Sequence, residues 1–220
     1  MATTAPSSRV RVRRAPKRAA YDRAQIDAIL DEALVCHVGF VHDEQPYVIP
    51  TLHARVGDVV YLHGSTASRM LRTLAGGAPC ALTATLLDGV VLARSAFHHS
   101  ANYRSVTVLG RARLVTSDEE RLRALEAFGE HLVPGRWAQV RPPSRKELKG
   151  TQVLALALDE AAAKIRTGPP VDDPSDMDRD VWAGELPLRL QALDPRPDPQ
   201  LAAGIALPEH VARWSASRTR

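Results

Sequence analysis

The residues of this chain with the clearest capacity for chemistry lie in segment 63–69, which reads His-Gly-Ser-Thr-Ala-Ser-Arg. The segment follows the strand-like residues 59–62 and stands where a helix is predicted to begin. Helix N-termini offer free backbone N–H groups and the positive end of the helix dipole. Hydroxyls and a guanidinium placed there predict a phosphate-binding site. The same residues are also typical of a plain helix cap, with Ser65 or Thr66 as the N-cap.

The elements that must position this segment are predicted from hydrophobic periodicity and turn signals. Residues 46–55 and 59–63 form two strands around the turn Gly57-Asp58. The dipeptide Asp88-Gly89 predicts a second turn, and Gly110 indicates a bulge or a close approach of another backbone. Further strands are predicted at 33–41, 80–86, 90–96, 103–116 and 151–158, and helices at 22–34, 65–76 and 117–131.

Six or seven strands with closely spaced turns, together with two or three helices, predict a mainly β (α+β) fold. The short connections favour a largely antiparallel β-barrel with flanking helices. Residues 1–20 are predicted to be a disordered basic arm, and residues 21–190 the folded domain. Residues 191–220 are predicted to be an irregular C-terminal tail.

Composition narrows the class of protein. The chain has 220 residues, 45% of them hydrophobic and 25% charged, which is typical of a globular domain. The net charge is +4, but much of the basic excess lies at the two ends, so no nucleic-acid partner is expected. No apolar run is long enough to span a membrane and no secretory signal is present, so a cytoplasmic location is expected.

Cysteines and histidines do not predict a metal site. Cys36 and Cys80 lack a C-x-x-C partner, which argues against a structural zinc site or a redox dithiol. His98 and His99 are adjacent and would point to opposite faces of an extended chain. His53 and His63 lie on neighbouring predicted strands, but no carboxylate or thiolate joins them at ligand spacing.

Several segments in the same order give the chain a family resemblance. Pro46-Tyr-Val-Ile-Pro-Thr-Leu-His-Ala-Arg55 and Tyr61-Leu-His-Gly-Ser-Thr-Ala-Ser-Arg69 are followed by Ala96-Phe-His-His-Ser-Ala-Asn-Tyr-Arg-Ser-Val106. They resemble the pyridoxamine 5′-phosphate oxidase-like flavoproteins, in the branch of nitroimidazole-resistance and flavin-nucleotide-binding proteins. Ser144-Arg-Lys-Glu-Leu-Lys149 and Val181-Trp-Ala-Gly184 also fit this branch. The resemblance covers about residues 20–190.

The resemblance implies an FMN-binding split β-barrel that forms a homodimer, with the flavin between the two subunits. It favours the phosphate site over the plain helix cap. The cofactor-binding residues that it implies are Thr51, Leu52, His53, His63, Gly64, Ser65, Ser68, Arg69, Tyr103, Arg104 and Ser105.

The activity implied by the resemblance is that of an FMN-dependent oxidoreductase acting on a small organic substrate. Because the flavin ring carries out the transfer, no catalytic residue is assigned. One alternative is a flavin-binding or flavin-storing protein without turnover. Another is a haem-binding split barrel with His98 or His99 as the axial ligand. A deazaflavin in place of FMN also stays open.

Overall fold

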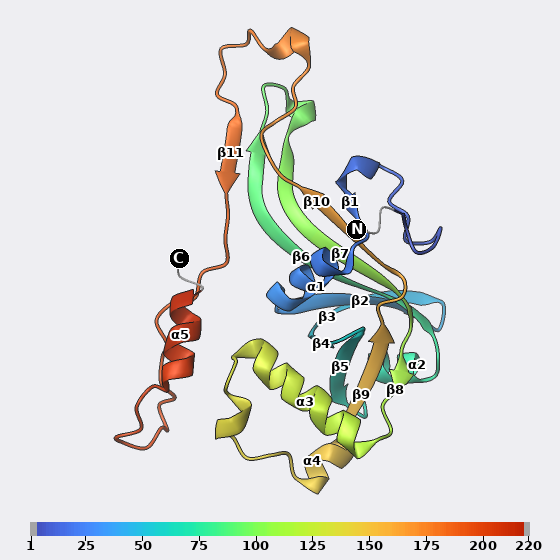
Figure 1. Ribbon diagram of the computed structural model, residues 1–220, viewed down its shortest axis with the longest axis vertical. Helices are drawn as coiled ribbons and strands as arrows, with labels where there is room; N and C mark the ends of the chain where they lie inside the picture. Colours follow the sequence, from blue (N-terminus) through green and yellow to red (C-terminus); the bar gives the residue numbers. More distant parts are fainter. Residues whose placement is uncertain (1–3, 218–220) are drawn as a thin grey trace.

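The computed structural model describes residues 4–217, so residues 1–3 and 218–220, the outer ends of the predicted arm and tail, lie outside it. Two antiparallel sheets form a split β-barrel (Figure 1), which confirms the predicted fold class. The larger sheet has the order β1-β10-β7-β6-β2-β3, with β11 also paired to β6. The smaller sheet has the order β4-β5-β9-β8. The strands are β1 (Ala19–Ala20), β2 (Val35–His42), β3 (Gln45–Leu52), β4 (Ala54–Val56), β5 (Val59–Ser65), β6 (Pro79–Leu92), β7 (Ser100–Arg111), β8 (Arg113–Leu114), β9 (Thr151–Ala157), β10 (Ala161–Arg166) and β11 (Gly184–Pro187).

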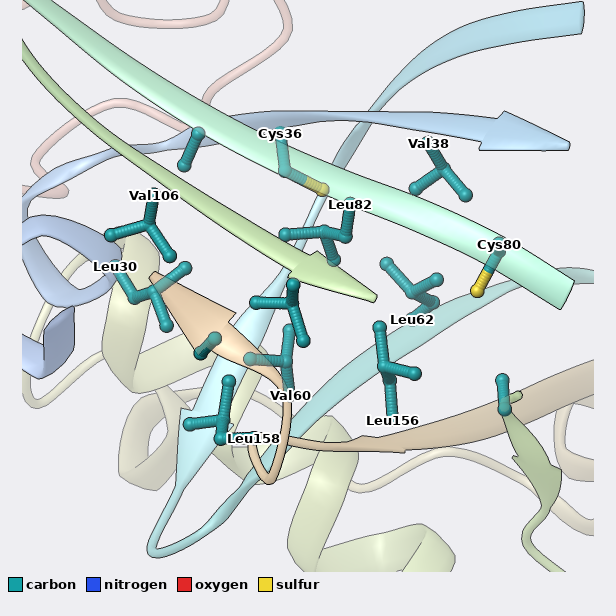
Figure 2. Packing of buried hydrophobic residues seen from close by; sticks show 14 of the residues in the cluster. Leu30, Cys36, Val38, Val60, Leu62, Cys80, Leu82, Val106, Leu156 and Leu158 are labelled. Carbon is teal, nitrogen blue, oxygen red and sulfur yellow. The ribbon is translucent and has the colours of Figure 1, made fainter. Parts of the chain in front are cut away.

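The hydrophobic core lies between the two sheets. In β2 the alternate residues Cys36, Val38 and Phe40 are buried, as expected for a strand with one face on the core. They belong to one buried cluster with Leu62 of β5 and Leu156 of β9 from the smaller sheet. Figure 2 labels Cys36, Val38, Leu62 and Leu156 within this cluster. This shared core holds together the strands from which the candidate site is built.

Helices close the barrel. Helix α1 (Arg23–Glu32) begins at the N-cap Asp22 and buries three aliphatic side chains in the core. Helix α2 (Arg69–Ala75) follows β5, and α3 (Asp118–Leu132) packs against β4 (Figure 1). The remaining helices are α4 (Arg145–Gly150) and α5 (Glu209–Ser217).

The turn predicted at Asp88-Gly89 is wrong. Strand β6 continues through this dipeptide to Leu92, with a register shift between Leu87 and Gly89. Gly89 is paired to β7 on one side and to β11 on the other. The dipeptide therefore forms a bulge, because neighbouring strands on both sides hold it extended.

The start of the helix after β5 was also predicted too early. Its N-cap is Ser68 rather than Ser65 or Thr66. Ser65 still belongs to β5, where it pairs with Thr151, and the Thr66 N–H donates to the Gly150 carbonyl at 3.1 Å. Pairing with β9 thus keeps Ser65 in the strand, and a turn at Thr66 and Ala67 separates it from the helix.

The two ends of the chain contact the folded domain. Within the predicted arm, β1 pairs with β10, Val10 is buried and Arg9 forms an ion pair with Glu160. The C-terminal arm, residues 168–217, runs beside the β6–β7 hairpin and ends in α5 (Figure 1). This helix lies where an irregular tail was predicted.

Candidate functional site

The loop between β5 and α2 is tightly folded by its own hydrogen bonds. The Ala67 N–H donates to Ser65 Oγ at 3.1 Å, and the Ser68 N–H donates to the Ser65 carbonyl at 2.9 Å. Together with the Thr66–Gly150 bond, these contacts use three successive backbone N–H groups. The loop amides are therefore not available to a ligand.

The first turn of α2 is more open. Ser68 Oγ accepts from the Leu71 N–H at 3.4 Å, whereas the N–H groups of Arg69 and Met70 have no partner within the helix. The hydroxyls of Ser65 and Ser68 accept these bonds and still have a proton to donate. We call the hydroxyls of Ser65 and Ser68, the Arg69 guanidinium and the two open amides the phosphate cradle.

The Arg69 side chain is held without using its hydrogen-bond donors. Its guanidinium carbon lies 4.9 Å from the centre of the Tyr47 ring, on β3. A cation above an aromatic face is attracted through that face, so the N–H edges stay free. Among the described residues no carboxylate pairs with Arg69. The cradle therefore presents a positive charge that an anion can bind.

Three of the predicted residues lie together beneath α3. The His53 ring is fully buried, and its Nε2–H donates to the Leu30 carbonyl at 2.9 Å. Burial is the main reason why the pKa of His53 is lowered to about 4. The His63 ring packs at a tilt against Phe128, with 4.1 Å between centroids and 59° between the ring planes, and burial lowers its pKa as well. Leu52 packs against the same apolar cluster as Phe128. These side chains support α1 and α3, and both imidazoles are neutral at pH 7.

Gly64 and Thr51 have backbone roles in this region. A Cβ on Gly64 would stand 3.1 Å from the Leu71 side chain, so glycine permits α2 to pack closely on β5. Thr51 pairs with Cys36 near the end of β3. Both residues fix where the cradle lies relative to the sheet.

Tyr103, Arg104 and Ser105 lie elsewhere, on β7. The Arg104 guanidinium donates to Glu32 at 2.5 and 2.8 Å and to Asp88 at 2.8 and 3.0 Å. These bonds raise its pKa and compensate its charge, so Arg104 is not free for an anionic ligand. Ser105 Oγ donates to the Lys164 carbonyl at 3.2 Å.

Within one chain, this part of β7 is separated from the cradle. In the larger sheet, β6 and β2 lie between β7 and β3, the strand that carries Tyr47. Three steps between neighbouring strands span about 14 Å. Within a single chain, the predicted residues on β7 and those of the cradle therefore do not contact the same ligand.

Sequence reasoning missed three residues beside the cradle. Tyr47 supports Arg69, while Arg72 and His42 line a cavity of about 260 Å³ with Arg69. Arg72 follows Arg69 by three residues, a spacing that places both on one helix face and that the sequence displays. His42 and Tyr47 come from the β2–β3 hairpin, and only the tertiary structure brings them to α2.

With this geometry established, comparison with known proteins identifies the family. A family model described as pyridoxamine 5′-phosphate oxidase matches residues 22–165, and the chain belongs to this family. This confirms the resemblance seen in the sequence. No curated protein matches the chain.

Two solved structures are similar over nearly the whole chain. The flavocytochrome Anf3 from Azotobacter vinelandii is 42% identical, with a TM-score of 0.91, over 95% of this chain and 97% of that one. The FAD- and haem-binding protein from Mycobacterium smegmatis is 40% identical, with a TM-score of 0.85, over 89% of this chain and 96% of that one.

A more distant structure shares the fold. It is a 5-nitroimidazole antibiotic resistance protein from Bacteroides thetaiotaomicron, 22% identical with a TM-score of 0.55, over 67% of this chain and 86% of that one. Within residues 4–217, no helix has the length and apolar character needed to cross a membrane. In the same range, no three His, Cys, Asp or Glu side chains gather as a metal-binding group.

Proposed function

We propose that this protein binds a flavin, with the phosphate in the cradle, and acts as an oxidoreductase. The observation that carries the proposal is the Arg69 guanidinium, which lies on the Tyr47 ring and pairs with no carboxylate among the described residues. Such a group suits a phosphate. Membership of the family and the 40–42% identity to two flavin- or haem-named proteins support it.

The chemistry of the cofactor defines which tasks are left to the protein. A bound flavin supplies hydride or electron transfer, and the chain supplies binding, orientation and exclusion of water. Arg69 neutralises the phosphate, while the two hydroxyls and the open amides fix its orientation. The resemblance implied FMN, whereas the similar Mycobacterium smegmatis protein binds FAD. The shared cradle serves the phosphate nearest the flavin in either molecule.

Haem is the second cofactor that we propose, because both similar structures are described as a flavocytochrome or a haem-binding protein. The histidine that fits as an iron ligand is His37, on β2. It is exposed, and its ring has no hydrogen-bond partner among residues 4–217. It pairs with Pro50 and Thr83 and follows the exposed Val35 by two residues. This sheet face is apolar enough to receive a flat macrocycle.

The histidines expected from the sequence fit a haem less well. His99 Nδ1 accepts from the Ala93 N–H at 2.9 Å, which leaves the ring proton on Nε2 and no free lone pair. His98 Nε2 lies 3.2 Å from the Asp173 carboxylate and donates to it, which leaves the Nδ1 lone pair open but ties the ring to the C-terminal arm. We therefore place the proposed iron ligand at His37 rather than at His98 or His99.

We also propose that the protein is a homodimer with the flavin at the subunit interface. Exposed aliphatic side chains lie on the β2–β3 hairpin, among them Val41, Val48 and Ile49. More than half of the large exposed hydrophobic residues belong to the C-terminal arm. Apolar surface of this kind is typical of protein interfaces.

The first test is the absorption spectrum of the full-length protein purified from a flavin- and haem-replete host, followed by identification of the released chromophores. A flavin spectrum supports the main proposal and a Soret band supports haem. A bound flavin that no reductant reduces would support the alternative of a flavin-storing protein without turnover. A released deazaflavin would replace the flavin assignment, and a colourless protein that ignores all three cofactors would overturn it.

Two variants assign the cofactors to residues. Arg69→Ala should weaken flavin binding at least tenfold, about 1.4 kcal/mol, because it removes a charged phosphate contact. His37→Ala should abolish the Soret band and leave the flavin bound, whereas the control His99→Ala should retain both. Unchanged flavin affinity in Arg69→Ala would show that the phosphate binds elsewhere.

A further inference from the structure

Positive charge is concentrated in one short stretch near the N-terminus, residues 9–18, which we call the arginine segment. Its cationic residues are Arg9, Arg11, Arg13, Arg14, Lys17 and Arg18, and it contains no aspartate or glutamate. These six positive charges exceed the net charge of +4 of the whole chain, so the other residues taken together are net negative. The arginine segment is therefore a strongly basic stretch on a protein that is otherwise slightly acidic.

The arginine segment has a fixed place on the fold. Val10 is buried, and the Val12 N–H donates to Tyr21 Oη at 3.0 Å. The segment ends in a single turn of 3-10 helix, Pro16–Arg18, which leads directly into β1 and its pairing with β10 (Figure 1). Because these contacts hold the backbone in place, a partner binds the segment without first having to order it.

Most of the charged side chains of the segment are exposed. They are those of Arg9, Arg11, Arg13, Arg14 and Lys17. Arg9 pairs with Glu160 at 3.0 Å, and among the described residues no other cation of the segment pairs with a carboxylate. Closely spaced charges of one sign raise the local electrostatic potential and attract a partner of opposite charge.

The arginine segment also borders the proposed cofactor site. Arg9 lines a groove of about 440 Å³ together with Phe40 and Tyr47. Tyr47 is the ring on which the guanidinium of Arg69 lies, 4.9 Å from the ring centre. A partner bound to the segment would therefore lie beside the site at which we propose that the flavin binds.

The composition of the segment disfavours two other anionic partners. Nucleic-acid bases are read by side-chain amides or stacked on aromatic rings, and residues 9–18 contain neither. A segment that inserts into a lipid surface exposes large apolar side chains, whereas Val10 is buried and Val12 is half-buried. The segment presents exposed charge without these features, which suits a folded protein with an acidic surface.

We propose that the arginine segment is the docking surface for an acidic electron-carrier protein. The proposal rests on the proposed oxidoreductase function and names the class of protein that supplies its electrons. In each encounter the reduced carrier gives up one electron and is oxidised. Two reduced carriers and two protons from water therefore reduce one oxidised flavin by two electrons. Attraction between the two charged surfaces speeds the encounter, and a small polar interface lets the carrier leave again.

The binding test is calorimetry of the full-length protein with two probes, an acidic plant-type ferredoxin and an acidic flavodoxin. The wild type should bind at least one of them, with an affinity that falls as salt is added, because salt screens exposed charges. The double variant Arg13→Glu with Arg14→Glu should weaken this binding by about tenfold or more. The matched control, Arg145→Glu with Lys146→Glu, reverses two exposed cations on α4 and should change the affinity by less than about twofold.

A kinetic measurement separates docking from the redox site. Reduction of the bound flavin by the carrier, followed by stopped-flow absorbance, should be about tenfold slower in the Arg13 and Arg14 double variant. Reduction by dithionite, a small reductant that needs no docking surface, should proceed at the wild-type rate in the same variant. Slowing by both reductants would show that the substitutions disturb the flavin site, which would overturn the docking role.

The other failures are also distinguishable. A wild type that binds neither carrier, or a double variant that binds them as tightly as the wild type does, overturns the docking proposal and leaves the flavin function intact. Binding to phosphatidylserine vesicles or to single-stranded RNA, without binding to a carrier, overturns the choice of an acidic protein. A purified protein that holds no flavin overturns the proposed oxidoreductase function, whatever it binds. All four substituted residues are exposed, so circular dichroism and thermal melting should match those of the wild type.

Discussion

At the scale of single residues, the buried His53 links the candidate site to stability. Burial lowers its pKa to about 4, whereas the unfolded chain has an ordinary histidine pKa of about 6.5. The unfolded state therefore binds more protons between these two values. Stability is fully present above pH 6.5 and falls as the pH decreases toward 4.

We predict that acidification from pH 7 to 4 costs about 3 kcal/mol of unfolding free energy through His53 alone. His53→Gln should keep a donor for the Leu30 carbonyl and lose most of this dependence. Urea denaturation of both proteins at pH 7 and 4.5 measures the difference. Parallel pH dependence in the two proteins would show that His53 does not carry the effect.

The reactivity of the two cysteine thiols also depends on the surroundings of single residues. Cys36 is fully buried, and desolvation raises its pKa to about 12, while burial raises the pKa of Cys80. Because the thiolate is the reactive form, both should resist a thiol reagent at pH 8 in the native protein. Both should react after unfolding in denaturant. Rapid labelling of the native protein would contradict this expectation.

At the scale of elements, β11 attaches the C-terminal arm to the barrel. It pairs with β6 from Leu92 to Gly89, where a Cβ would stand 3.0 Å from the Leu186 carbonyl. The obstructing atoms are backbone, so they cannot move aside as a flexible side chain would.

We therefore predict that Gly89→Ala displaces β11 and speeds proteolytic cleavage of the arm several-fold. Gly150→Ala is the matched control, because no atom lies within 4 Å of its Cβ position. Limited proteolysis followed by mass spectrometry compares the two variants. Equal cleavage would mean that the arm is held elsewhere, for example through the Arg94–Asp172 ion pair.

At the scale of the whole molecule, the proposed dimer accounts for the apolar surface of the β2–β3 hairpin. Val48 has 66% of its surface exposed in one chain, so Val48→Lys leaves the core of the subunit intact. We predict a particle of twice 24.0 kDa for the wild type and a shift toward the monomer for the variant, measured by light scattering. The exposed Val171→Lys, on the arm, is a control for added charge. A wild-type monomer would overturn the proposed interface.

Local sequence signals were sufficient where one stretch of chain specifies its own structure. The helices predicted at 22–34 and 117–131 correspond to α1 (Arg23–Glu32) and α3 (Asp118–Leu132). The turn predicted at Gly57-Asp58 joins β4 to β5, and Gly57 has a positive φ angle there. Such features depend on neighbours within about one turn, so periodicity and capping preferences reveal them.

The candidate site was only partly readable from the sequence. Segment 63–69 contains Ser65, Ser68 and Arg69, and the structure places these residues at the end of β5 and the start of α2. It also shows that the backbone N–H groups of residues 66–68 already donate hydrogen bonds within the protein. The Arg104 guanidinium likewise forms ion pairs with two carboxylates. Whether a polar group is free depends on partners that are distant in the chain, which no local pattern contains.

The sequence by itself determined the family and the antiparallel barrel, because alternation, turns and short motifs are local properties. Only the tertiary structure decided which charges are available. It brought Tyr47 under Arg69, placed His42 beside Arg72 and buried His53 against α1. The physical reason is that pairing and desolvation are set by chain segments that meet only when the two sheets close on their common core.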